Sequence, residues 1–106
     1  MKNFTPRQLN DYLKDVEETP LLLDVREPSE FAICHIEGAV LMPMRTVPAR
    51  LFECERDREV VVICHHGHRS MMVARFMEQQ GYDHVINLSG GVNAWAREID
   101  LEMPTY

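Results

Sequence analysis

Residues 60–70 read VVVICHHGHRS, and this stretch decides the fold of the 106-residue chain. Its first four residues are all β-branched, which is typical of a strand buried on both faces of a parallel sheet. After the loop that follows, apolar side chains recur at helical spacing from Met72 to Met77, and Gly81 is placed to end that helix. The stretch therefore predicts a buried strand, a loop and a helix, with Cys64 at the carboxyl end of the strand.

The same alternation of strand and helix extends outward in both directions. Thr5 can cap a helix that begins at Pro6 and ends before Thr19. The remaining segments are predicted as strands over 21–25, 38–42 and 85–88, and as helices over 28–33, 47–54 and 92–99. Strands alternating with helices imply right-handed crossovers. We therefore expect an α/β fold with a small, mainly parallel sheet and helices on both faces, forming one domain over residues 1–106.

Composition excludes several classes of protein. The net charge of −6 argues against a nucleic-acid binder, and no apolar run approaches the ~20 residues of a membrane helix. The start of the chain lacks the apolar stretch of a secretory signal, so we expect a cytoplasmic protein. Three cysteines, none in a C-x-x-C pair, do not form a disulfide framework. The question is then which thiol is reactive.

Position singles out Cys64, because ligands of open α/β sheets bind beyond the carboxyl ends of the strands. A thiolate is the nucleophile, whereas an ordinary cysteine thiol is mostly protonated at neutral pH. The loop offers groups that favour the thiolate: the start of the next helix, converging amides around Gly67, the charge of Arg69 and the hydroxyl of Ser70. The loop histidines would add positive charge below about pH 6.5.

Three blocks of sequence resemble the rhodanese family of sulfurtransferases. Residues 64–70 match its C-x-x-G-x-R-S loop, and residues 24–39 contain motifs similar to its D-V-R-E, E-[FY] and H-I-x-G-A signatures. Residues 81–95 are similar to the closing segment, with G-Y, L-x-G-G and A-W in that order. Together the blocks cover most of the chain in the family's order.

The resemblance implies a mechanism and a set of residues. Cys64 would carry a sulfane sulfur as a persulfide, taken from a small anionic donor such as thiosulfate or from a protein persulfide. The acceptor would be cyanide or a thiol, and neither metal nor organic cofactor is expected. Asp24 and Arg26 would support the loop rather than react. Donor binding would fall to the rest of the loop, namely His65, His66, Gly67, His68, Arg69 and Ser70.

Other interpretations compete with this one. Cys64 could be a small buried hydrophobe, the role we expect for Cys34 and Cys54. A metal site is disfavoured, because zinc ligands seldom crowd into five adjacent positions. A cysteine phosphatase or arsenate reductase would use C-x5-R, whereas Cys64 and Arg69 are spaced C-x4-R, a smaller ring that suits one sulfur atom. A non-catalytic binding module on the same fold is the remaining alternative.

Overall fold

A five-stranded parallel sheet forms the centre of the molecule in the computed structural model, which describes residues 1–106. The strands lie in the order β1-β5-β4-β2-β3, and every neighbouring pair is parallel. This confirms the predicted α/β class. The strands are β1 Lys2–Phe4, β2 Leu21–Asp24, β3 Val40–Leu41, β4 Val60–Ile63 and β5 Val85–Leu88.

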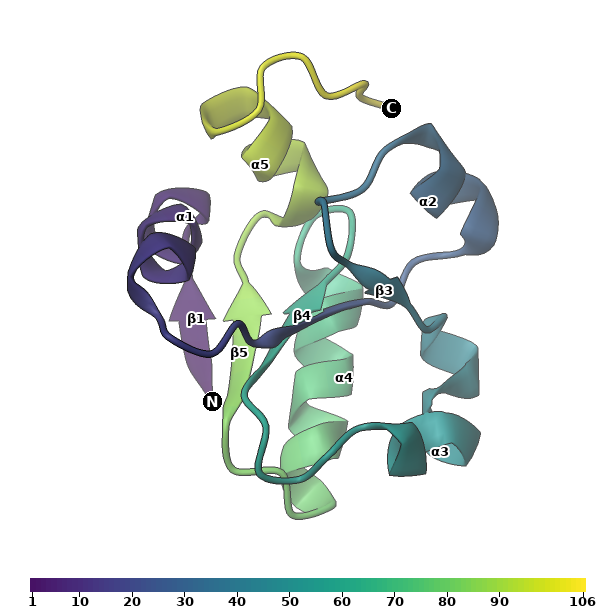
Figure 1. The fold of residues 1–106 in the computed structure, drawn as a ribbon. Coiled ribbons are helices and arrows are strands. Elements are labelled where there is room, and N and C mark those ends of the chain that lie inside the picture. The colour runs from purple at the N-terminus through teal and green to yellow at the C-terminus, as the bar shows by residue number, and fades with distance from the viewer.

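Helices cover both faces of the sheet, as predicted (Figure 1). One face is covered by α1 and α5, and the other by α4 and the short α3. The helices are α1 Pro6–Asp15, α2 Pro28–Ile33, α3 Val47–Arg50, α4 His68–Gln79 and α5 Gly91–Glu98, and two 3₁₀ turns span Met44–Thr46 and Leu51–Glu53. No helix combines the length and the apolar character needed to cross a membrane.

The central strand β4 supplies side chains to both hydrophobic layers. Val60 and Val62 face α4, whereas Val61 and Ile63 pack with Leu9 of α1 and Trp95 of α5. All four β4 residues are buried. This two-sided burial explains why the strand reads as an unbroken apolar run and why it lies in the middle of the sheet.

Two parts of the fold differ from the prediction. The edge strand β1 was not predicted, because Lys2 and Asn3 give it no apolar pattern; its place comes from pairing with β5. The helix expected over 47–54 is α-helical only to Arg50 and then tightens into a 3₁₀ turn. Across this turn the Arg50 guanidinium bonds the Glu53 carboxylate at 2.8 Å, and residues three apart align in 3₁₀ geometry.

Candidate active site

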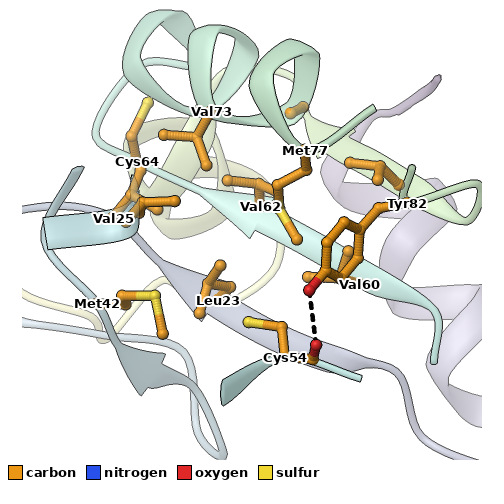
Figure 2. Close-up of a cluster of buried hydrophobic side chains, with 13 residues drawn as sticks. Leu23, Val25, Met42, Cys54, Val60, Val62, Cys64, Val73, Met77 and Tyr82 are labelled. Atoms are coloured by element: carbon orange, nitrogen blue, oxygen red, sulfur yellow. Dashed lines mark hydrogen bonds between the residues drawn. The ribbon is translucent and has the colours of Figure 1, made fainter. Parts of the chain in front are cut away.

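Cys64 follows β4 at the carboxyl edge of the sheet and is 1% exposed. It borders the core cluster, with its sulfur directed toward the start of α4 (Figure 2). The Gly67 amide donates a hydrogen bond to Cys64 Sγ over 3.0 Å. α4 begins at the next residue, so its positive end faces the sulfur. The sulfur of Cys64 thus lies where negative charge is stabilised.

The loop from Cys64 to Gly67 is held by both of the helices beside it. Gly67 caps α4 with φ of 101°, a conformation that favours glycine. On the other side, the amides of Val92 and Asn93 in α5 donate to the carbonyls of Cys64 and His65 over 2.9 and 3.1 Å. A Cβ at Gly91 would collide with those same carbonyls. The close approach of α5 therefore requires glycine at position 91.

Ser70 connects Cys64 to a buried amide. Cys64 Sγ lies 3.3 Å from Ser70 Oγ, and Ser70 Oγ donates to Asn87 Oδ1 over 2.5 Å. Asn87 belongs to β5 and bonds in turn to Asn3 Oδ1 over 3.1 Å. Sequence reasoning missed Asn87, although a polar residue inside a buried strand is a signal that could have found it. The Ser70 hydroxyl, which we expected to donate into the loop and favour the thiolate, instead accepts from the Cys64 thiol and donates to Asn87.

Arg69 is paired with a carboxylate. Its two terminal nitrogens donate to Glu30 Oε1 and Oε2 over 2.7 and 2.8 Å. The Glu27 amide and the Tyr106 hydroxyl also donate to Glu30. The bonds from Arg69 lower the pKa of Glu30 to about 2, although partial burial alone would raise it. The same pairing raises the pKa of Arg69. Glu30 is thus a member of the site that sequence reasoning did not assign.

Asp24 and Arg26 form a fully buried ion pair at the end of β2. The guanidinium of Arg26 donates to both carboxylate oxygens of Asp24, with the shortest bond at 2.7 Å. Arg26 also donates to the Cys34 carbonyl over 2.7 Å and to the Tyr106 hydroxyl over 2.9 Å. These bonds go to the segment after α2 and to the end of the chain. If Asp24 and Arg26 support the Cys64 loop, as predicted, they do so indirectly, through the segment after α2 and the end of the chain.

The three loop histidines have different surroundings. The ring of His65 stacks on that of Tyr106, with centroids 3.9 Å apart. Burial lowers the pKa of His65, with a smaller contribution from His66, so His65 gains its charge at a lower pH than an ordinary histidine. His66 and His68 are exposed and line a hollow of about 430 Å³ beside the loop, together with Arg75. Tyr106 gave no signal in the sequence.

The other two cysteines are buried, and only Cys34 lies near the loop, where it lines a small hollow with His65. Cys34 and Cys54 are 8% and 6% exposed. Burial raises the pKa of the Cys54 thiol, and its carbonyl accepts a hydrogen bond from the Tyr82 hydroxyl over 2.7 Å (Figure 2). A raised pKa keeps a thiol in its unreactive form. The surroundings of Cys54 are those of a packing residue.

Comparison with known proteins agrees with this arrangement. The family model "Rhodanese-like domain" matches residues 5–98. A protein of Allochromatium vinosum named "Sulfurtransferase" is 44% identical over 89 residues, covering 84% of this chain and 82% of the relative. A Mycobacterium tuberculosis protein named "Probable adenylyltransferase/sulfurtransferase MoeZ" is 36% identical over 96% of this chain, which spans only 26% of that relative.

Solved structures show the same fold. The crystal structure of a rhodanese-like domain protein from Staphylococcus aureus superposes with a TM-score of 0.83 at 33% identity, covering 90% of this chain and 91% of that one. The family model spans the four strands that follow β1, together with the Cys64 loop and the whole of α5. Together with the sequence relatives, these matches show that the chain belongs to the rhodanese-like domain family.

Proposed function

We propose that this protein is a sulfurtransferase in which Cys64 carries a sulfane sulfur as a persulfide. The donor is thiosulfate or a persulfide, and the acceptor is cyanide or a thiol. The observation that carries the proposal is the Gly67 amide, which donates to Cys64 Sγ over 3.0 Å at the start of α4. The name of the Allochromatium vinosum relative supports the same class of reaction.

A persulfide on Cys64 would need hydrogen-bond donors around its outer sulfur. A persulfide places its outer sulfur about 2 Å beyond Sγ. The carbonyls of Cys64 and His65 are occupied by α5, and a trans peptide directs the following N–H to the opposite side. The amides of His65 and His66 therefore point away from α5. In our proposal they join the Gly67 amide in stabilising the negative charge on the outer sulfur.

The reaction consists of two displacements at sulfur. In the first, the Cys64 thiolate attacks the outer sulfur of thiosulfate; an S–S bond forms at Cys64, and sulfite leaves with the electron pair of the broken bond. In the second, cyanide or a thiolate attacks the outer sulfur of the persulfide, and the Cys64 thiolate is released. Thiocyanate is the product with cyanide. The two steps balance without an external oxidant or reductant.

The pairing of Arg69 with Glu30 affects which sulfur donor the site would favour. Arg69, which would attract an anion, already holds the Glu30 carboxylate through two hydrogen bonds. Thiosulfate must compete with Glu30 for this guanidinium, whereas a donor recognised through other contacts need not. We therefore propose that a thiol-borne persulfide is a better donor than thiosulfate. We assign the reaction to the cytoplasm, where three unpaired cysteines are typical.

Intact mass measurement tests the proposal. The reduced protein is incubated with thiosulfate and, separately, with glutathione persulfide, beside Cys64→Ser and the matched control Cys54→Ser. We expect wild type and Cys54→Ser to gain the mass of one sulfur atom, and cyanide to remove it as thiocyanate. Equal sulfur uptake by Cys64→Ser would contradict the assignment. Turnover of an aryl phosphate without sulfur uptake would favour the phosphatase alternative.

A further inference from the structure

Asn87 is a polar residue in a strand that is otherwise apolar. β5 reads Val-Ile-Asn-Leu, all four residues are buried, and Asn87 is 1% exposed. A buried amide destabilises a fold unless its hydrogen-bonding groups are satisfied. The Asn87 amide meets this requirement with two side chains, Ser70 and Asn3. A leucine or valine would fit the pattern of the strand equally well, so the amide calls for a reason other than packing.

The bonds of Asn87 lead to the nucleophile. Asn3, Asn87, Ser70 and Cys64 form a continuous chain with separations of 3.1, 2.5 and 3.3 Å. Ser70 and Cys64 are 0% and 1% exposed, so water does not substitute for these partners. The chain connects β1, β5, the first turn of α4 and the end of β4. Each donor in it is matched with one acceptor.

The number of protons fixes the direction of these bonds. A serine hydroxyl has one proton, and Ser70 donates it to Asn87 Oδ1. Ser70 therefore presents a lone pair to Cys64 Sγ, which suits a thiol because its S–H can donate. A thiolate has no proton to donate. For Ser70 to stabilise the thiolate, its hydroxyl must turn from Asn87 to the sulfur, which leaves Asn87 Oδ1 buried without a donor.

We infer that Asn87 is a positioning residue that, through Ser70, opposes ionisation of the reduced Cys64 and so partly offsets the stabilisation of its thiolate by the Gly67 amide and α4. This rests on the proposed function only in taking Cys64 as the nucleophile. A persulfide is penalised less than a thiolate by the same arrangement, because its negative charge lies on the outer sulfur and Sγ is neutral. The Asn87–Ser70 pair thus favours the sulfur-loaded state over the free thiolate and limits side reactions of the unloaded enzyme.

The pH dependence of Cys64 alkylation by iodoacetamide tests this inference, with the Cys64 peptide followed by mass spectrometry so that Cys34 and Cys54 do not interfere. In Asn87→Leu the Ser70 hydroxyl is free to donate to the sulfur. We expect the midpoint of the profile to fall by about one pH unit, which corresponds to a tenfold larger thiolate fraction below the midpoint. The same substitution in a Ser70→Ala background should not lower the midpoint.

A surface variant keeps the test valid if Asn87→Leu does not fold. Asn3 lies on the edge strand and holds the Asn87 amide in its orientation. In Asn3→Ala the amide can turn and donate to Ser70, so the midpoint should fall in the same direction by a smaller amount. Two results would overturn the inference. One is an unchanged or raised midpoint in both Asn87→Leu and Asn3→Ala; the other is a fall caused by Asn87→Leu that is equally large in the Ser70→Ala background. Since alkylation needs no sulfur donor, this result is independent of sulfur uptake.

The other charged groups on the elements packed around the Cys64 loop are unchanged in these variants. Their effect on the pH midpoint of alkylation is therefore the same in every protein compared. They come from the loop and α4, from β2 and the residues that follow it, and from α2 with the end of the chain. These groups are His65, His66, His68 and Arg69; Asp24 and Arg26; and Glu30 with Tyr106.

Discussion

Arg69 and Glu30 are joined by two parallel hydrogen bonds of 2.7 and 2.8 Å, so the permanent cation of the Cys64 loop is already bound to a carboxylate. Both side chains are partly shielded, at 32% and 18% exposed. Charge-assisted bidentate pairs of this kind are among the strongest polar contacts in proteins. An incoming anion therefore meets a neutral ion pair rather than a free guanidinium.

Replacing Glu30 with glutamine should improve the use of thiosulfate. Glu30→Gln keeps the shape of the side chain but removes the charge that competes for Arg69. We expect the KM for thiosulfate to fall about fivefold, the order of magnitude of one modest ion-pair contribution. Steady-state thiocyanate production measures it. Glu27→Gln is the matched control, because Glu27 pairs with the exposed Arg45 instead. An unchanged KM in Glu30→Gln would contradict this assignment of specificity.

The same pair predicts a loss of stability in acid. The pKa of Glu30 is held at about 2 by Arg69, below the ordinary value of 4.5. A carboxyl whose pKa is lowered by folding stabilises the protein above its unfolded pKa and loses that contribution as pH falls through the folded value. Because the pair is partly exposed and therefore screened by solvent, we expect Glu30 to contribute about 2 kcal/mol at neutral pH, less than the full effect of its lowered pKa. Urea unfolding should show that wild type is more stable than Glu30→Gln at neutral pH, and that this difference in the free energy of unfolding shrinks as the pH falls from 4.5 toward 2.

Removing one partner of the buried Asp24–Arg26 ion pair should strongly destabilise the fold. Arg26→Met leaves the Asp24 carboxylate buried without its counterion, and such changes destabilise proteins by about 3–5 kcal/mol. The double variant Asp24→Leu/Arg26→Met should recover part of this loss, because no charge is left behind. Urea unfolding measures both. If the two variants unfold at the same denaturant concentration, the buried charge is not the cause. Sulfur uptake by the double variant tests the predicted support of the loop.

Tyr106 should control the protonation of His65. Its ring covers the imidazole, and burial is the largest cause of the lowered pKa of His65. In Tyr106→Ala we expect that pKa to rise toward the ordinary histidine value, because the imidazole becomes hydrated. A titration followed by NMR at the His65 ring proton measures the change. Tyr106→Phe keeps the stacked ring and should titrate like wild type; a shift in that variant would instead implicate the hydroxyl bonds to Arg26 and Glu30.

The fold and the position of Cys64 at the sheet edge could be predicted from local pattern, because β4 is buried on both faces and the loop follows it directly. Glu30 was part of a quoted motif, yet its pairing with Arg69 joins residues 39 apart and has no local signal. Tyr106 reaches Arg26 across 80 positions, which is equally invisible in the sequence. Strand β1 is defined by its partner β5 rather than by its own residues. What escaped prediction is therefore long-range pairing between polar groups.

The contact between Gly91 and the Cys64 loop has a consequence for how the protein loses function. The first amides of α5 hold the carbonyls of Cys64 and His65, so the shape of the loop depends on a helix that lies more than twenty residues further along the chain. Proteins open in cooperative units rather than bond by bond. Fraying of α5 would release the peptide groups beside Cys64 while the sheet beneath remained folded. Inactivation by heat or denaturant should then precede global unfolding, with the last helix as its point of origin.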